Sequence, residues 1–197
     1  MNICIFGDSI AWGAYDPERG GWATRLRNYL EKKNRYIIVY NLSISDEITT
    51  DLLTHLEIEI KSRESNLIIF AIGTNDAQFI HSVSSSRVLF DEFKNNLKKL
   101  YAIAKRFADK IVFVGLTSVD DSKTKPFSLN PNISYTNENI KHFDGAIKKF
   151  CEENNVKFIS MDGIIDIADL DDGLHPNTEG HKKMFDKIKT EIEVLLQ

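Results

Sequence analysis

Three side chains that could form a nucleophilic site lie far apart in the sequence. Ser9 follows the first apolar segment, while Asp172 and His175 stand three residues apart in Asp172-Gly173-Leu174-His175. A serine hydroxyl becomes an effective nucleophile when a histidine takes its proton and a carboxylate holds that histidine in the right tautomer. Gly173 permits a tight turn that can fold the carboxylate back onto one imidazole nitrogen. Taken alone, this stretch is also typical of an acidic surface turn that caps a helix.

The elements that must position these residues alternate between strand-like and helix-like patterns. Pro176 suits the first turn of a helix, and a closing helix is predicted directly after His175. Apolar runs and β-branched segments predict strands, and apolar residues at helical spacing predict helices. The predicted strands cover residues 2–6, 36–42, 66–72, 110–116 and 156–160. The predicted helices cover residues 20–34, 46–61, 85–107, 137–154 and 176–196, and residues 117–136 form one long irregular segment.

Five strand-then-helix units predict an open parallel sheet with helices on both faces, a three-layer α/β/α sandwich. Right-handed crossovers give a flavodoxin-like strand order such as 2-1-3-4-5. In this architecture ligands bind outside the carboxyl ends of the strands. Small and polar residues follow each predicted strand, so a site is expected at that edge of the sheet.

Length and composition limit the class of protein. The 197 residues are expected to form a single domain over positions 1–197, with 42% hydrophobic and 27% charged residues. A net charge of −4 without a Lys/Arg cluster gives no reason to expect nucleic acid as a partner. Cys4 and Cys151 fit buried free thiols of a reducing compartment, and no spacing suggests a metal or another cofactor. No segment resembles a signal peptide or a membrane span, so a cytoplasmic location without membrane insertion is expected, and the oligomeric state is left open.

Four sequence blocks, taken together and in this order, resemble the SGNH hydrolases, also called the GDSL esterase/lipase family. The likeness runs from Phe6 to His181, and each block alone is a weak signal. The blocks are Gly7-Asp8-Ser9-Ile10, Asn41 to Thr49, Gly73-Thr74-Asn75-Asp76 and Asp172-Gly173-Leu174-His175-Pro176-Asn177.

The resemblance implies a metal-independent serine esterase that acts on a small-molecule ester or thioester through an acyl-enzyme. Ser9 would be the nucleophile, His175 the base and Asp172 the carboxylate that orients it. The oxyanion hole would consist of the backbone N–H groups of Ser9 and Asp46 and the side-chain amide of Asn75. Trp12 and Phe79 are candidates for lining an acyl pocket.

One departure from the family pattern concerns Asp46, which stands where the family has a glycine. Its backbone N–H is retained, but a positive φ would be more costly for aspartate than for glycine. A carboxylate near a developing oxyanion could also oppose it, unless the side chain points away or caps the following helix.

Three other functions stay open on the sequence alone. The family includes carbohydrate O-deacetylases, so an acetylated sugar is one alternative substrate. Because of Asp46, a second alternative is a catalytically impaired relative that binds an ester without turning it over. The third is a flavodoxin-like binding module, although neither a dinucleotide fingerprint nor a P-loop follows the first strand.

Overall fold

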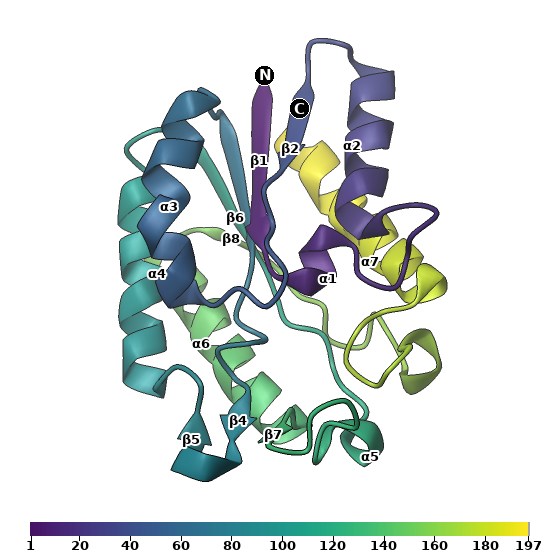
Figure 1. Cartoon of the computed structure of the whole chain (residues 1–197). Coiled ribbons are helices and arrows are strands. Elements are labelled where there is room, and N and C mark those ends of the chain that lie inside the picture. Colours follow the sequence, from purple (N-terminus) through teal and green to yellow (C-terminus); the bar gives the residue numbers. More distant parts are fainter. Residues whose placement is uncertain (197) are drawn as a thin grey trace.

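The centre of the fold is a five-stranded parallel sheet in the order β2-β1-β3-β6-β8 (Figure 1). The computed structural model describes residues 1–196. The strands are β1 (Asn2–Gly7), β2 (Ile38–Asn41), β3 (Leu67–Ala71), β6 (Lys110–Val114) and β8 (Lys157–Ile159). Counted within this sheet alone, the order is 2-1-3-4-5. The predicted fold class is therefore confirmed.

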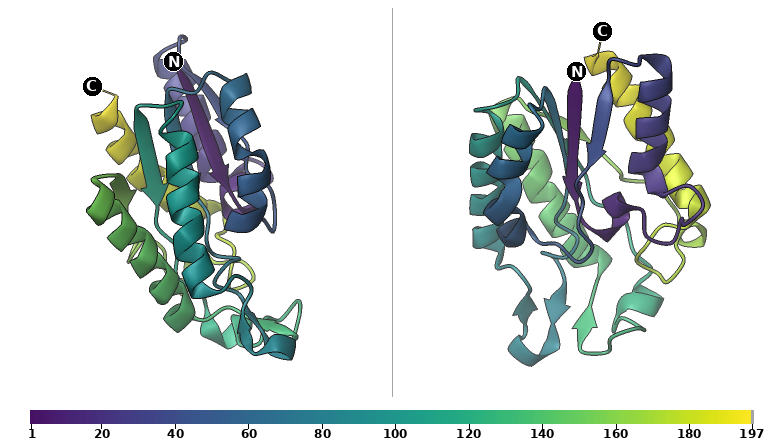
Figure 2. Two further views of the ribbon diagram at one scale, coloured as in Figure 1. Left: turned by 90° about the vertical axis from the view of Figure 1, so that its left-hand side faces the viewer. Right: turned by 45° about the horizontal axis from the view of Figure 1, so that its top comes forward.

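Helices cover both faces of the sheet and divide the core in two. Successive side chains of a strand point to opposite faces. Ile3 and Ile5 accordingly join one apolar cluster, while Cys4 and Phe6 join the other. All four are fully buried, as a strand between two helical layers requires. The first cluster includes residues of α2 (Gly21–Lys33) and α7 (Thr178–Leu195), and the second includes residues of α3 (Thr49–Ser62), α4 (Phe90–Ala104) and α6 (Asn137–Asn154). Figure 2 shows these two groups of helices on opposite sides of the sheet.

A small second sheet with the order β5-β4-β7 includes one strand from the predicted helix over residues 85–107 and one from the predicted irregular segment, while its middle strand lies outside the predicted elements. Its strands are β4 (Phe79–Ile80), β5 (Ser85–Ser86) and β7 (Ile133–Ser134). The predicted helix over residues 85–107 is therefore wrong in its first turn, and α4 begins at Phe90. The reason is that the N–H groups of Arg87 and Val88 donate to the loop carbonyls of Gln78 and Asp76 rather than within a helix.

The segment from residue 117 to 136 is more ordered than predicted. Besides β7 it contains the short helix α5 (Asp121–Thr124). Asp120 precedes this helix, and its side chain accepts a hydrogen bond from the Ser122 N–H. A short polar helix of this kind has no apolar periodicity, so its residues read as loop in the sequence.

The start of the last helix also differs from the prediction. Asn177 is the N-cap of α7, since its side chain accepts from the N–H groups of Glu179 and Gly180. The helix proper begins at Thr178. Pro176 lies outside it and instead forms a β-bridge with Leu170. An N-cap asparagine stabilises a helix start more directly than a proline at the first helical position.

Gly7 ends β1 at a point where no side chain fits, and this gives the first test of the fold. A Cβ at residue 7 would meet the Ala71 carbonyl and lie 2.6 Å from the Ala11 Cβ. We expect Gly7→Ala to lower the free energy of unfolding by about 1–3 kcal/mol. Gly145→Ala in α6, where nothing lies within 4 Å, should raise it by about 0.5–1 kcal/mol. Urea unfolding of both variants checks the pair, and equal stabilities would contradict this account of β1.

Candidate active site

Ser9 sits on the turn between the end of β1 and the start of α1 (Ser9–Trp12). Asp8 is the N-cap of this one-turn helix, and its Oδ1 accepts a hydrogen bond from the Ile10 N–H at 3.0 Å. The helix ends at Gly13, whose φ of 106° only glycine adopts easily. Ser9 is 8% exposed, and its backbone is held locally, since its carbonyl accepts from the N–H groups of Gly13 and Ala14 at 3.0 Å.

The structure brings Ser9, His175 and Asp172 together in one chain of hydrogen bonds. Ser9 Oγ lies 2.9 Å from His175 Nε2, and His175 Nδ1 lies 2.8 Å from Asp172 Oδ2. The other carboxylate oxygen, Oδ1, accepts from the backbone N–H groups of Leu174 at 2.9 Å and His175 at 2.8 Å. The carboxylate thus holds both the ring of His175 and the backbone that carries it.

The ionisation of Asp172 follows from these contacts. Burial by itself raises the pKa of a carboxyl group, but hydrogen bonds from the His175 ring and from two backbone N–H groups outweigh it. The pKa of Asp172 is consequently lowered to about 2. The carboxylate therefore stays ionised at any pH near neutrality and can orient an imidazole whose Nδ1 carries the proton.

The loop from Asp172 to His175 is held by neighbouring segments as well as by its own turn. Gly173 has a φ of 91°, a backbone conformation that glycine adopts readily. Its carbonyl accepts from the Asp120 N–H at 2.8 Å, so the segment before α5 supports the turn. The Asp171 N–H donates to the His175 carbonyl at 2.9 Å and closes the loop.

Each of the three residues predicted for an oxyanion hole has an N–H hydrogen without an acceptor among residues 1–196. Within residues 1–196, the backbone N–H groups of Ser9 and Asp46 donate to no protein acceptor. Asn75 is 4% exposed, and one of its amide hydrogens goes to the Glu47 carbonyl at 3.1 Å. The second hydrogen of this amide remains available, since a side-chain amide carries two.

Asp46 has the positive φ expected for the position of the family glycine, at 67°. Its carboxylate points to Arg87, whose Nη1 and Nη2 lie 2.5 and 3.1 Å from the two oxygens. The Asp46 side chain is 69% exposed and that of Arg87 is 23% exposed. The negative charge at this position is therefore paired with a guanidinium.

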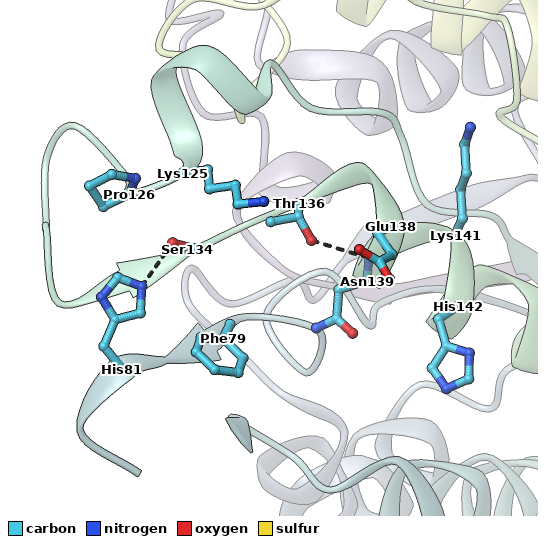
Figure 3. A pocket seen from close by; sticks show the side chains of 10 residues that line it. All are labelled: Phe79, His81, Lys125, Pro126, Ser134, Thr136, Glu138, Asn139, Lys141 and His142. Atoms are coloured by element: carbon cyan, nitrogen blue, oxygen red, sulfur yellow. Dashed lines mark hydrogen bonds between the residues drawn. The ribbon is translucent and has the colours of Figure 1, made fainter. Parts of the chain in front are cut away.

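The two residues suggested for an acyl pocket lie in different places. Trp12 ends α1 and is 58% exposed, and its part in substrate binding stays a prediction. Phe79 lines a cavity of about 930 Å³ beside the small sheet, together with Ser134 and residues of α6 (Figure 3). Along β4 and β7, Phe79 pairs with Ser134 on the cavity side. Among residues 1–196, the lining of this cavity does not include Ser9, Asp172 or His175.

Two tyrosines near the site were not singled out in the sequence. The ring of Tyr15 stacks on His175 with 5.0 Å between centroids and an interplanar angle of 26°. The hydroxyl of Tyr135 donates to Asn75 Oδ1 at 3.1 Å. Both residues come from segments without a helix or strand pattern, so periodicity offers no signal for either.

The remaining histidines make structural contacts. His181 is fully buried, and its Nδ1 accepts from the Trp22 N–H while its Nε2 donates to the Ala14 carbonyl. It therefore joins α7 to the start of α2. Among residues 1–196, no group of three or more His, Cys, Asp or Glu side chains could hold a metal ion. No helix in the same range has the length and apolar character needed to cross a bilayer.

Asp76 stabilises the start of α3 from outside that helix. The N-cap residue of α3 is Ile48, whose side chain cannot accept a hydrogen bond. Both carboxyl oxygens of Asp76 instead lie 3.1 Å from the Thr49 N, and the Thr49 hydroxyl also donates to Asp76. Burial raises the pKa of Asp76 to about 7, against the lowering effect of the bonds from Thr49.

This raised pKa predicts a pH-dependent contribution of Asp76 to stability. Between the unfolded pKa near 4 and the folded pKa of about 7, the folded state keeps a proton that the unfolded state has lost. The contribution is therefore present at low pH and falls by up to about 1.4 kcal/mol per pH unit as the pH rises. Asp76→Asn cannot titrate, and urea unfolding from pH 5 to 8 should show wild type losing stability relative to it. Parallel pH profiles would contradict the assignment.

Comparison with known proteins identifies the sequence relatives of the chain. Residues 5–183 match the GDSL-like Lipase/Acylhydrolase family. An isoamyl acetate-hydrolyzing esterase of Saccharomyces cerevisiae is 29% identical over 147 residues, which cover 68% of this chain. The chain matches 60% of the length of that yeast protein.

Solved structures with the same fold include enzymes of low sequence identity. An acetylxylan esterase from Geobacillus stearothermophilus has a TM-score of 0.75 at 18% identity, covering 97% of this chain and 93% of the other. LAE5, an alpha/beta hydrolase from the metagenome of Lake Arreo in Spain, has a TM-score of 0.75 at 16% identity, covering 96% and 93%. The similarity in structure extends over nearly the whole chain, and the sequence match covers residues 5–183. The chain belongs to the GDSL-like Lipase/Acylhydrolase family.

Proposed function

We propose that this protein is an esterase that hydrolyses carboxylic esters through Ser9, His175 and Asp172. The observation that carries the proposal is the unbroken hydrogen-bond chain from Ser9 Oγ through the His175 ring to the Asp172 carboxylate. Each link is 2.8–2.9 Å, within the range over which a proton can pass. Family membership supports the same reaction class.

In the proposed reaction, Ser9 Oγ attacks the ester carbonyl carbon while His175 Nε2 takes the serine proton. Asp172 stays ionised, because its pKa is lowered to about 2, and stabilises the imidazolium that forms. His175 then returns the proton to the departing alkoxide, which leaves as an alcohol and gives an acyl-serine. A water molecule, deprotonated by His175, attacks the acyl-serine and releases the carboxylic acid and free Ser9.

The negative oxygen of the tetrahedral intermediate needs donors that are already in place. We assign this role to the backbone N–H groups of Ser9 and Asp46 and to the spare amide hydrogen of Asn75. Support comes from their lack of other acceptors among residues 1–196 and from the burial of Asn75. The pairing of Asp46 with Arg87 argues against an impaired site, because it keeps the carboxylate from opposing the oxyanion.

For the substrate we propose an ester with a short acyl group, acetate above all. The yeast relative is named for isoamyl acetate, and a protein of the same fold is named for acetylxylan. These two names share the acetyl group and differ in the alcohol, which is a simple alcohol in one case and a carbohydrate in the other. A panel of p-nitrophenyl esters from acetyl to long-chain, with isoamyl acetate and acetylated xylan added, separates these substrates.

The first test of this mechanism removes the nucleophile and the base. We expect Ser9→Ala and His175→Ala each to reduce kcat on the best ester of the panel by about 10⁶-fold. The double variant should be little worse than either single one, because the residues act as a unit. Initial rates and circular dichroism spectra of the three variants provide the measurement. A Ser9→Ala protein that still turns over the ester would overturn the proposed function.

The second test concerns the position of the family glycine. Asp46→Gly relieves the strain of a φ of 67° and removes an exposed ion pair, which is worth about 0–1 kcal/mol. We expect kcat to hold or rise, while stability falls slightly through the greater freedom of the unfolded chain. Asp46→Asn is the matched control, since asparagine tolerates positive φ and removes only the charge.

The two variants at position 46 separate strain from charge. A rise in kcat for glycine alone would indicate strain, and an equal rise for both would indicate charge. A tenfold or larger fall in kcat in both variants, with the fold intact, would mean that the carboxylate itself has a part in the reaction.

A further inference from the structure

Asn75 lies in a line of buried polar side chains that reaches the small sheet. Gln78 Nε2 donates to the Tyr135 hydroxyl, and that hydroxyl donates to Asn75 Oδ1 at 3.1 Å. On the other side of the amide, Asn75 Nδ2 donates to the Glu47 carbonyl at 3.1 Å. The three side chains have 3–6% exposed surface, so water competes little for these bonds.

The direction of each bond in this line follows from chemistry. A backbone carbonyl only accepts, so the group of Asn75 that faces Glu47 must be the NH₂ end. The oxygen of the amide must then face Tyr135, and the phenol must donate to it. Burial raises the pKa of Tyr135, so the phenol keeps the proton that it donates. If the amide were flipped, its oxygen would face the Glu47 oxygen without a hydrogen between them.

We infer that Tyr135 is a positioning residue, which fixes the side-chain amide of Asn75 so that its second N–H faces the oxyanion. The inference rests on the proposed function, in which Asn75 is an oxyanion donor. The small sheet then has a role in the site, because its pairing places Tyr135 and Gln78. β4 and β7 pair Phe79 with Ser134, so the residues next to them, Gln78 and Tyr135, meet on the opposite face from the cavity.

The ring of Tyr135 is held independently of its hydroxyl, and this makes a clean variant available. Phe127 packs edge-to-face on the ring at 5.6 Å between centroids. The backbone of Tyr135 is also fixed, since its carbonyl accepts from the Thr124 hydroxyl at 2.7 Å and its N–H donates to the Thr124 carbonyl at 2.9 Å. Tyr135→Phe therefore removes the hydroxyl and leaves the ring and strand supported.

We expect Tyr135→Phe to lower kcat by about tenfold with KM changed less than about twofold, because the Asn75 amide loses the partner of its oxygen. Asn75→Ala alone should lower kcat by about 10²–10³-fold. In the Asn75→Ala background, Tyr135→Phe should have almost no further effect on kcat. A residue with a merely structural role would lower kcat equally in both backgrounds.

Tyr29→Phe in α2 is the matched control. It also removes a phenol hydroxyl and its hydrogen bond, the one to Glu193 Oε1 of α7 at 2.6 Å, away from every residue assigned to the site. Its kcat should equal that of wild type. If Tyr135→Phe does not fold, Gln78→Met tests the same line, with a loss of about two- to fivefold that disappears in the Asn75→Ala background.

Two results would overturn the inference. One is an equal loss from Tyr135→Phe, or from its substitute Gln78→Met, with and without Asn75. The other is an unchanged kcat in that variant with its fold intact. The Ser9→Ala protein in the same assay distinguishes these failures from a failure of the proposed function, since activity that survives without Ser9 belongs to another mechanism.

Discussion

The structure depends on the burial of β1 in the middle of a parallel sheet. This strand pairs with β2 on one side and β3 on the other, and its residues 3–6 have no exposed surface. Because the strands are parallel, the segments that follow them all emerge at one edge. Ser9 comes directly after β1 and meets a histidine 166 residues further along the chain. The burial of β1 and its pairing on both sides therefore place Ser9 at this edge, next to the loop that carries that histidine.

The candidate site is held by contacts within its own loops and by contacts with segments far away in the sequence. The Asp172–His175 pair is local, since a turn with positive φ at Gly173 brings both groups together within four residues. The position of that turn relative to Ser9 depends on distant contacts, among them the bond from Asp120 to the Gly173 carbonyl. Asn75, the proposed oxyanion donor, is held in a similar way, by Glu47 and Tyr135 from two other loops. The loop of Asp172 and His175 and the side chain of Asn75 are thus both held by segments other than their own.

Much of the fold and part of the site could be predicted from the sequence, for physical reasons that also explain the failures. Buried strands and amphipathic helices leave periodic apolar patterns. The blocks of Ser9 and Asn75 directly follow such strands, and the block of Asp172 and His175 directly precedes the last helix. The strands of the small sheet have two residues each, too few to show alternation. Tyr135 and Arg87 lie next to these strands, so neither their partners nor their roles could be read from spacing. The positive φ of Asp46 was predictable, but the guanidinium that faces it was not.

The chain order of the hydrogen-bonded residues has a consequence for biosynthesis. β1 lies between β2 and β3, which both follow it in the chain, and Ser9 precedes His175 by 166 residues. Its histidine is synthesised much later, and the loop that carries it is followed by α7, which packs against α2. A nascent chain therefore has a serine hydroxyl with no base until nearly all of the domain has emerged and its last helix has docked. Under the proposed function, a chain that ends before His175 would hold the serine without its base and could not attack esters in its surroundings.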